Sequence, residues 1–219
     1  ADVLYANSVT VSMALTGGSA GNYQLVNGTV YLAGTIDPKG IDVEIGGSLD
    51  KTYDGTSALV VPISLTDTVS GDDVGVTGAY YNNAGDITAN AGANIVKFEL
   101  TGDDKANYSL NNSSFAATIA RKAITITGIA VNDKIYDKTT DAMAYVNTAN
   151  AQINGKIGLD VINFSVISAE FDSVDAIEQN VAIKVTLDND NYTCEDFVVR
   201  GKIVPKTLTA ILNLDKTYD

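Results

Sequence analysis

The sequence contains no histidine and no tryptophan, and Cys194 is its single cysteine among 219 residues. These absences exclude His-based catalytic triads, His-ligated zinc or haem, cysteine-rich zinc sites and an internal disulfide framework. Lysine and arginine total 14 against 27 acidic residues, and the formal charge of −13 argues against nucleic acid and anionic membrane surfaces as partners. No apolar run reaches the roughly 18 residues that a membrane-spanning helix needs, and the start does not resemble a signal peptide. We therefore expect no nucleic-acid partner and no membrane insertion of this segment.

The acidic residues are strongly biased towards aspartate. Asp outnumbers Glu by 22 to 5, and asparagine and glycine are also abundant. Asp, Asn and Gly favour turns through local hydrogen bonds and positive φ, whereas Glu is the better helix former. This composition indicates an all-β protein in which many short strands are joined by turns.

One motif recurs at a fixed interval. Asp-Lys-Thr-Tyr-Asp-Gly-Thr at 50–56 returns as Asp-Lys-Ile-Tyr-Asp-Lys-Thr at 133–139 and begins again at 215–219, so that its tyrosines lie 83 and 82 residues apart. An Asn-Tyr pair follows the same period, with intervals of 85 and 84 residues. Landmarks that keep one order and one period identify tandem repeats of about 83 residues. The tyrosines of the Asn-Tyr pairs are Tyr23, Tyr108 and Tyr192.

These landmarks divide the chain into four parts. Residues 1–40 correspond to the C-terminal half of a preceding repeat, 41–122 and 123–206 are complete repeats, and 207–219 begin the next one. A repeat of about 83 residues has the size of a small domain rather than of a solenoid turn. The linkers are short and lack Pro-rich or Ser-rich spacers, so we expect neighbouring repeats to be stiffly joined.

Each repeat contains several segments in which apolar and polar residues alternate. Residues 123–129, 161–167 and 181–187 alternate with period two, and no stretch carries an apolar stripe of helical period over three turns. This pattern favours small antiparallel β-sandwich domains of immunoglobulin-like type, arranged in an elongated array. The alternative is a β-grasp-like repeat with one short helix, for which residues 140–145 are the best candidate.

Four landmarks recur in both complete repeats. They are the Lys-x-Tyr-Asp-Gly-Thr motif, the Gly-x-Asp-Val turn at 71–74 and 158–161, the Asn-Tyr segment, and a closing Ile-x-x-Lys. Together they resemble the YDG-type repeat domains, which occur in tandem in large bacterial cell-surface and adhesin-like proteins. The resemblance implies a secreted, surface-displayed spacer or adhesin stalk and supplies no catalytic residues. In the second repeat Lys138 replaces the motif glycine, so either that glycine is dispensable or the turn differs there, because lysine rarely adopts positive φ.

The motif residues allow a catalytic and a structural interpretation. In a strand Lys51 and Tyr53 share one face, which could present a Lys–Tyr–Asp active site with Asp54. In the structural interpretation the tyrosine ring fills the edge of the core and the aspartate caps the next turn. Recurrence in every repeat favours structure, so we expect no enzyme and no catalytic or cofactor-binding residue. The predicted structural positions are Lys51, Tyr53, Asp54, Lys134, Tyr136, Asp137, Tyr23, Tyr108 and Tyr192.

Two further positions are interpreted through the repeat. Asn107 and Asn191 open formal glycosylation sequons and precede tyrosines that could stack on carbohydrate, but their repeat position favours a turn asparagine before a strand tyrosine. Cys194 stands where Leu110 stands in the first repeat, so we expect a core position rather than a reactive thiol.

Aspartate-rich turns are the one candidate for a metal site. Ca²⁺ takes six to eight oxygen ligands, which clustered Asp and Asn side chains at domain joints could supply. The twelve-residue calcium loop with its closing Glu is absent, so a structural Ca²⁺ rests on clustering alone. The candidate ligands are Asp72, Asp73, Asp103, Asp104, Asp188 and Asp190.

The sequence therefore predicts a non-enzymatic stalk or spacer segment of an extracellular, bacterial cell-surface adhesin-like protein, whose partners are the neighbouring repeats. One alternative is a fibre-forming segment, in which homotypic chains complete the half-repeats at each end by strand exchange. Another is a module that binds a glycan or a host protein through exposed tyrosines that do not recur in each repeat. The candidates for that surface are Tyr5, Tyr31, Tyr80, Tyr81 and Tyr145.

Overall fold

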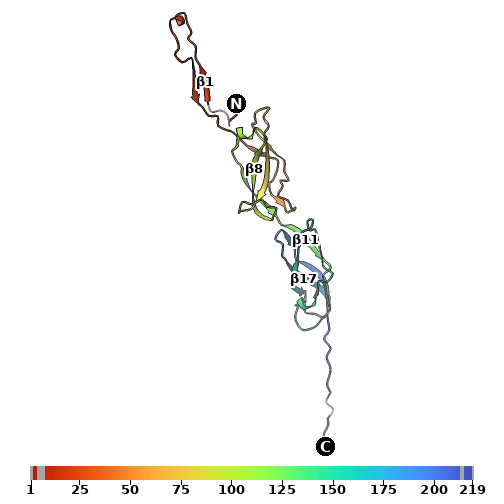
Figure 1. Ribbon diagram of the computed structural model, residues 1–219. Helices are drawn as coiled ribbons and strands as arrows, with labels where there is room; N and C mark the ends of the chain where they lie inside the picture. Colours follow the sequence, from red (N-terminus) through yellow and green to blue (C-terminus); the bar gives the residue numbers. More distant parts are fainter. Residues whose placement is uncertain (1, 4–7, 213–214, 219) are drawn as a thin grey trace. The chain divides into compact units, whose positions relative to one another are not determined.

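The computed structural model describes residues 2–3, 8–212 and 215–218, and these residues form strands, turns and short 3₁₀ segments without an α-helix (Figure 1). The all-β prediction is confirmed. None of the helical segments in the described residues is long and apolar enough to cross a bilayer. Contacts divide the chain into two compact units. The first unit comprises Ala1–Lys51, Thr56–Ala89 and Ala93–Ile119, and the second comprises Thr52–Gly55, Asn90–Gly92 and Ala120–Asp219.

The first unit contains a four-stranded sheet with the order β5-β10-β8-β7. Strands β3 and β9 pair in parallel, β4 and β6 pair antiparallel, and β1 and β2 form a separate antiparallel hairpin. The strands are β1 (Ser8–Ser12), β2 (Thr29–Ala33), β3 (Lys39–Ile41), β4 (Val43–Ile45), β5 (Lys51–Thr52), β6 (Ile63–Leu65), β7 (Gly75–Tyr81), β8 (Gly92–Thr101), β9 (Tyr108–Leu110) and β10 (Ser114–Ala120).

The second unit repeats this organisation. Its four-stranded sheet has the order β13-β19-β17-β16, and β11 pairs in parallel with β18 and antiparallel with β15. The parallel pair matches Lys122 with Tyr192, as β3 and β9 match Lys39 with Tyr108. The strands are β11 (Lys122–Thr127), β12 (Ala130–Val131), β13 (Lys134–Ile135), β14 (Val146–Asn147), β15 (Gln152–Asn154), β16 (Phe164–Phe171), β17 (Glu178–Leu187), β18 (Tyr192–Cys194) and β19 (Phe197–Val204).

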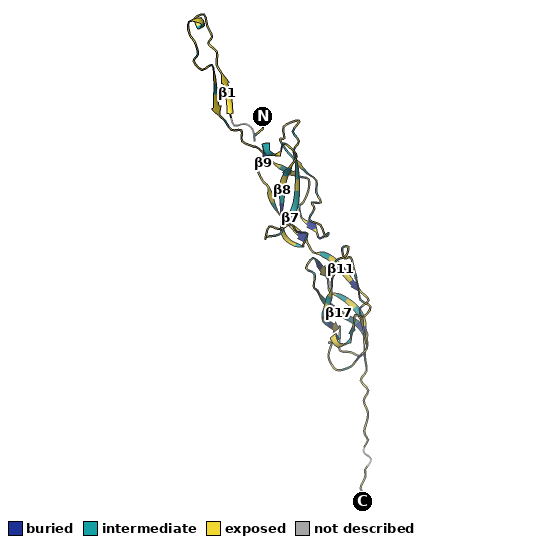
Figure 2. Ribbon diagram, viewed as in Figure 1, coloured by how far each residue is buried: buried dark blue, intermediate teal, exposed yellow. Residues whose placement is uncertain are grey.

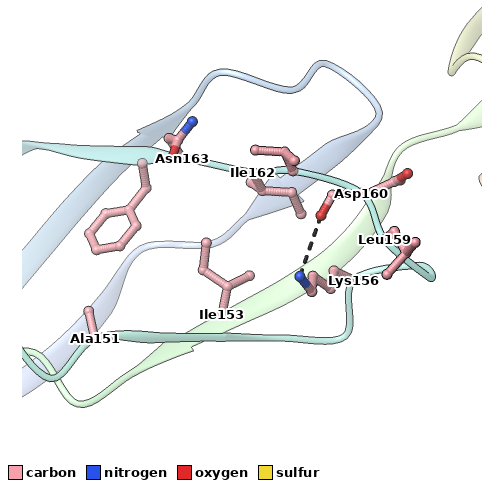
Figure 3. Close-up of a pocket in the computed structure, with 9 residues that line it drawn as sticks. Ala151, Ile153, Lys156, Leu159, Asp160, Ile162 and Asn163 are labelled. Carbon is pink, nitrogen blue, oxygen red and sulfur yellow. Dashed lines mark hydrogen bonds between the residues drawn. The ribbon is translucent and has the colours of Figure 1, made fainter.

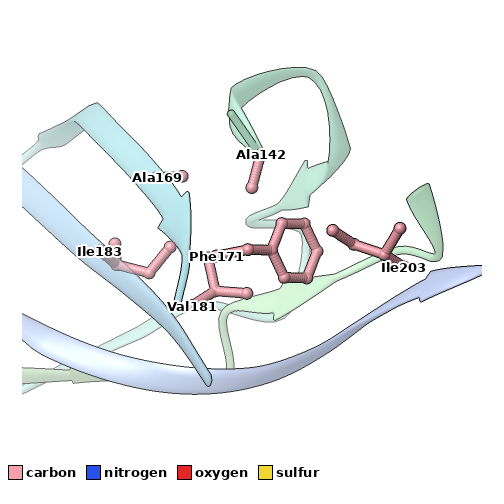
Figure 4. Close-up of a cluster of buried hydrophobic side chains, with 6 residues drawn as sticks. All are labelled: Ala142, Ala169, Phe171, Val181, Ile183 and Ile203. Atoms are coloured by element: carbon pink, nitrogen blue, oxygen red, sulfur yellow. The ribbon is translucent and has the colours of Figure 1, made fainter. Parts of the chain in front are cut away.

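The core of the second unit lies between these strands (Figure 4). Val181 and Ile183 on β17 are fully buried because alternate residues of a strand face the same side. Phe171 on β16 lies across from Val181, and Ile203 on β19 closes the cluster. Burial of such side chains contributes roughly 1.5–3 kcal/mol each, so this cluster makes a substantial contribution to the stability of the unit.

Two predicted elements differ from the structure. The alternating segment at 161–167 becomes a strand only from Phe164, because residues 157–160 form a turn in which the Asp160 amide donates to the Ile157 carbonyl. The helix expected over 140–145 by the β-grasp alternative is a single 3₁₀ turn, η3 (Met143–Tyr145). Two more 3₁₀ turns, η1 (Ala20–Asn22) and η2 (Lys105–Asn107), each precede the tyrosine of an Asn-Tyr pair.

The β1–β2 hairpin buries little of its surface. Every residue of β1 is exposed, and only Val30 of β2 is half-buried (Figure 2). A two-stranded hairpin has no second layer to cover its apolar face, so its apolar side chains remain in contact with solvent.

Candidate functional site

Two tyrosines share one aspartate in the second unit. The Tyr53 hydroxyl donates a hydrogen bond to Oδ2 of Asp160 at 2.8 Å, and the Tyr192 hydroxyl donates to the same oxygen at 2.5 Å. The two rings meet edge to face, with their centroids 5.3 Å apart and their planes at 74°. Both rings are buried, so this tyrosine–aspartate cluster is a packed, hydrogen-bonded element of the unit.

The local backbone positions each member of the cluster. Tyr192 begins β18 and is held in register against Lys122 of β11. The amide of Ile157 donates to the Tyr192 hydroxyl at 2.9 Å, so this hydroxyl both donates and accepts. Asp160 ends the 157–160 turn, which aims its carboxylate at the two tyrosines.

The protonation states follow from these contacts. Burial, together with the hydrogen bond to Asp160, raises the pKa of Tyr53 to about 12. Burial and the same carboxylate also raise the pKa of Tyr192, and the hydrogen bonds from Tyr192 and Tyr53 lower the pKa of Asp160. The raised pKa values of the two tyrosines and the lowered pKa of Asp160 all favour neutral phenols around an ionised carboxylate. None of the three groups therefore changes charge near pH 7, where a general acid or base operates best.

The motif lysine closes its own loop in each repeat. Lys51 Nζ donates to the Thr56 carbonyl at 2.7 Å and to the Ala58 carbonyl at 3.1 Å. Lys134 Nζ donates to the Thr139 carbonyl at 2.9 Å and the Asp141 carbonyl at 2.7 Å, and both lysines also reach the threonine hydroxyl. We call this arrangement the lysine clamp. A buried ammonium needs such oxygens because an unpaired charge in the interior is costly.

In the second clamp Lys134 pairs with the aspartate of the motif. Asp137 Oδ1 lies 3.1 Å from Lys134 Nζ and accepts hydrogen bonds from the amide and the hydroxyl of Thr139. These contacts, with the Thr139 amide as the largest cause, lower the pKa of Asp137 to about 2. The aspartate of the motif therefore caps its turn, as the structural interpretation expects.

The turn at Lys138 is the same turn that Gly55 forms in the first repeat. Lys138 has φ of 72° and Gly55 has φ of 79°, so both residues lie in the left-handed region. The sequence left open whether the glycine is dispensable or the turn differs, and the backbone shows that the turn is kept. Lysine therefore carries a conformational cost that glycine avoids.

The first unit contains a matching aspartate–tyrosine pair. The Tyr108 hydroxyl donates to Asp72 Oδ2 at 2.6 Å and accepts from the Val69 amide at 2.9 Å, as Tyr192 does with Asp160 and Ile157. The hydrogen bond to Asp72 raises the pKa of Tyr108. We call Asp72 and Tyr108 the first-unit pair.

The asparagines before these tyrosines bind an extended segment in the same way. Asn191 Oδ1 accepts from the Ala91 amide at 2.7 Å, and its Nδ2 donates to Asn90 at 3.1 Å. Asn107 Oδ1 accepts from the Val3 amide at 2.9 Å, and its Nδ2 donates to Asp2 at 3.2 Å. The Asn-Tyr landmark therefore has a binding role in both units that repeat position alone did not reveal.

A shallow groove runs beside Asp160 in the second unit (Figure 3). It has a volume of about 440 Å³, and Ile153, Ile162 and Phe164 supply much of its apolar lining. Lys156 Nζ approaches the Asp160 carbonyl at 3.5 Å, and Leu159 at the rim is 96% exposed. Its lining mixes these apolar side chains with the polar groups of Lys156, Asp160 and Asn163.

The tyrosines proposed for a binding surface fall into different environments. Tyr80 is fully buried, so the expectation that it is exposed is wrong: its hydroxyl donates to the Leu49 carbonyl, and Lys51 Nζ lies 4.8 Å from its ring centroid. Tyr31 is 74% exposed, whereas Tyr81 and Tyr145 are half-buried. Tyr5 lies outside the described residues.

Tyr23 differs from the other Asn-Tyr tyrosines. It is 72% exposed, whereas Tyr108 and Tyr192 are buried. In the complete repeats the tyrosine opens a strand that pairs with β3 or β11, whereas Tyr23 lies in the connection between β1 and β2, outside the strands. Among the described residues, no strand pairs with the segment at Tyr23 as β3 pairs at Tyr108 and β11 at Tyr192.

Five of the six calcium candidates use their carboxylates on neighbouring groups, and the printed contact of the sixth, Asp103, is made by its backbone amide. Within the part of the chain that the structure describes, no three His, Cys, Asp or Glu side chains are placed to share a metal ion. The observed contacts are Asp72 with Tyr108, Asp73 with the Asp103 amide, Asp104 with the Asp73 amide, Asp188 with Asn163, and Asp190 with Arg121.

Cys194 is half-buried, as is Leu110 at the matching position. Burial is the main cause that raises the pKa of its thiol. A thiol with a raised pKa carries less thiolate at neutral pH and is a poor nucleophile.

The repeated sheet order, the two lysine clamps and the two aspartate–tyrosine pairs define an all-β tandem-repeat protein. The YDG domain matches this sequence twice, over residues 37–116 and 120–197, and the chain belongs to that family. No protein with a curated description matches the sequence.

Two solved structures show weak similarity. Drosophila N-cadherin EC1-3 is 7% identical, with 82% of this chain and 73% of that chain covered and a TM-score of 0.25. The N-terminal part of the bacterial S-layer protein SbsC is 15% identical, with 74% and 44% covered and a TM-score of 0.19. Similarities at this level carry no argument about fold or function.

Proposed function

We propose that this chain is a non-enzymatic structural segment, a stalk or spacer of immunoglobulin-like sandwich repeats in an extracellular, bacterial adhesin-like surface protein. The observation that carries the proposal is the use made of the family motif. Lys51 and Lys134 close loops, and Tyr53 is a packed member of the tyrosine–aspartate cluster. Motif residues with these roles contribute stability and shape rather than chemistry.

Local geometry supports a stiff connection between repeats. Only Arg121 separates β10 from β11, which leaves little freedom for a flexible linker. The second unit also takes in residues 52–55 and 90–92, which the sequence places in the first repeat.

Small-angle scattering of the purified chain at low concentration tests this proposal. We expect a long, stiff monomer whose scattering is unchanged by calcium or a chelator. Tyr53→Phe removes one hydrogen bond to Asp160 and should increase flexibility, whereas the matched control Tyr23→Phe alters an exposed ring and should not. A compact wild-type particle, or a flexible one identical to Tyr53→Phe, would contradict the stalk.

A binding module is the second candidate, and the groove beside Asp160 is the observation that favours it. The exposed side chain of Leu159 at its rim would contact the apolar face of a sugar ring or a side chain of a host protein. A glycan array probed with the wild type and with Leu159→Ser would test this function. Equal binding by both proteins, or none by the wild type, would reject the groove as the site.

A further inference from the structure

The first and last strands of the second repeat each pair in parallel with another strand. The first strand, β11, pairs with β18, beginning with Lys122 opposite Tyr192. The last strand, β19, pairs with β13, in which Lys134 lies opposite Ile203. On its other side β19 pairs antiparallel with β17, so it is an inner strand of the four-stranded sheet. Both ends of the repeat are therefore anchored in parallel ladders.

Parallel pairing decides how a tension along the chain acts on these ladders. Such a tension pulls β11 from its N-terminal end and β19 from its C-terminal end. Because β18 leads into β19 through residues 195–196 alone, β18 is drawn in one direction while β11 is drawn in the other. The strands of a parallel pair run the same way, so these pulls slide them lengthwise and strain all their hydrogen bonds together. Neighbouring ends of an antiparallel pair, pulled apart, would open one bond at a time.

The family motif supplies one strand of the second ladder. The strand β13 is the Lys134–Ile135 stretch of the motif, and the Tyr136 amide extends its ladder by donating to the Val204 carbonyl at 2.9 Å. In the first repeat the Tyr53 amide donates in the same way to the Ala120 carbonyl at 2.8 Å. The same motif positions therefore hold the last strand of each complete repeat.

The lysine clamp ties this strand to the opposite edge of its sheet. The outer strands of the four-stranded sheet are β13 and β16. The ammonium of Lys134 binds the loop at 139–141, and the Phe171 amide of β16 donates to the Thr140 carbonyl of that loop at 2.9 Å. Lys134 is fully buried, so water does not compete for these carbonyls. To leave the sheet, β19 must therefore slide past a strand that is fixed at both edges.

We propose that the β11–β18 and β13–β19 ladders form a force-bearing seam, which lets the second repeat resist unfolding when the chain is stretched from its ends. The proposal deepens the stalk function and rests on it, because a spacer that holds other parts of a protein away from a surface is stretched in this direction. The resistance depends on direction, since the hydrogen bonds of the seam act together only under a lengthwise pull. The motif lysine and the motif tyrosine amide thereby acquire a mechanical role.

Single-molecule force spectroscopy of the full chain in two pulling directions tests the seam. Handles on Arg121→Cys and Lys206→Cys, just outside β11 and β19, pull the seam lengthwise. Handles on Ser165→Cys and Thr186→Cys, exposed partners on β16 and β17, open an antiparallel ladder from its end. Both pairs are made in a Cys194→Leu background, which leaves the handles as the only thiols. We expect the second direction to unfold the unit at about half the force or less, because the bonds break in sequence.

A matched pair of variants tests the motif strand itself. Tyr136→Pro and Tyr136→Ala both remove the ring, but only proline lacks the amide that donates to Val204. Under the lengthwise pull, Tyr136→Pro should unfold at a lower force than Tyr136→Ala. Under the pull on β16 and β17, the two variants should unfold alike. Equal lengthwise forces for the two variants would overturn the role of the motif strand.

The comparison of directions needs no change in the motif, so it decides the proposal even where Tyr136→Pro does not fold. Equal unfolding forces in the two directions would overturn the seam. Small-angle scattering tests the stalk separately. A stiff chain whose second unit unfolds at equal forces would reject the seam alone, and a compact chain with direction-dependent forces would reject the stalk alone.

Discussion

The two lysine clamps close in the same way but bury their lysines to different depths, with Lys51 9% exposed and Lys134 fully buried. Each ammonium binds the carbonyl and the hydroxyl of the threonine five residues later. In the first clamp Lys51 also lies over the ring of Tyr80, and in the second Lys134 pairs with the carboxylate of Asp137. The repeat therefore preserves the loop geometry, and the Tyr80 ring in the first clamp and the Asp137 carboxylate in the second both contribute favourable electrostatics at the ammonium.

The largest expected effect comes from removing the more deeply buried clamp. Lys134 has no exposed surface, so Lys134→Met takes the ammonium donor from the Thr139 and Asp141 carbonyls and removes the ion pair with Asp137, and it should lower the free energy of unfolding of the second unit by about 3 kcal/mol. Lys51 is 9% exposed, and water can reach the oxygens that Lys51→Met frees, so about 2 kcal/mol is expected there. Urea unfolding measures both. Equal losses of unfolding free energy in the two variants would show that the depth of burial does not determine how much each lysine stabilises its unit.

The tyrosine–aspartate cluster provides the next comparison. Tyr53→Phe removes one hydrogen bond to an ionised carboxylate and should cost about 2 kcal/mol. Tyr136→Phe, at the same motif position but without that bond, should cost little. Thermal unfolding of the two variants decides this, and a similar loss in both would mean that the ring rather than the hydroxyl stabilises the motif.

Alkaline titration reports on the same hydrogen bond. The folded pKa of Tyr53 is raised to about 12 from the ordinary value of 10.0, so the folded state holds this proton more tightly than the unfolded state does. The resulting stabilisation is complete below pH 10 and is lost as the pH rises towards 12. Wild-type stability should therefore fall more steeply over that range than the stability of Tyr53→Phe.

The motif turn gives a smaller effect with opposite signs in the two repeats. Lys138→Gly relieves a left-handed residue and should stabilise the second unit by about 1 kcal/mol. Gly55→Ala should destabilise, because φ is 79° and the new Cβ would lie 3.1 Å from the Ile157 side chain. Calorimetry of both variants provides the test. Destabilisation by Lys138→Gly would show that the lysine side chain makes a compensating contact.

The smallest effect concerns acid. The folded pKa of Asp137 is lowered to about 2 from an ordinary 3.8, so its contribution is present above about pH 4 and is lost as the pH falls towards 2. Asp137→Asn should lose less stability over this range than the wild type does. If the stabilities of the two proteins fell in parallel with pH, Asp137 would not contribute to the loss of stability in acid.

Local sequence patterns predicted the all-β class, the three strands β11, β16 and β17, and the structural use of the motif. Alternation at 123–129 and 181–187 identified β11 and β17 because one face of each strand is buried. The tyrosine–aspartate cluster could not be predicted in this way, since Tyr53 and Asp160 are 107 residues apart. The Gly-x-Asp-Val turns even match Asp160 with Asp73, whereas the hydrogen bonds match it with Asp72. The turn differs by one residue between the repeats, and a motif alignment cannot detect that shift.

The hydrogen bond from Tyr53 of the first repeat to Asp160 of the second repeat has a consequence for how such a protein can evolve. Each complete repeat carries both a motif tyrosine and an aspartate–tyrosine pair, so every repeat contains a donor and an acceptor of the same kind. A duplicated or deleted repeat of about 83 residues therefore brings or removes one donor together with one acceptor. The length of the array can change in whole repeats by recombination, with no need for compensating substitutions elsewhere.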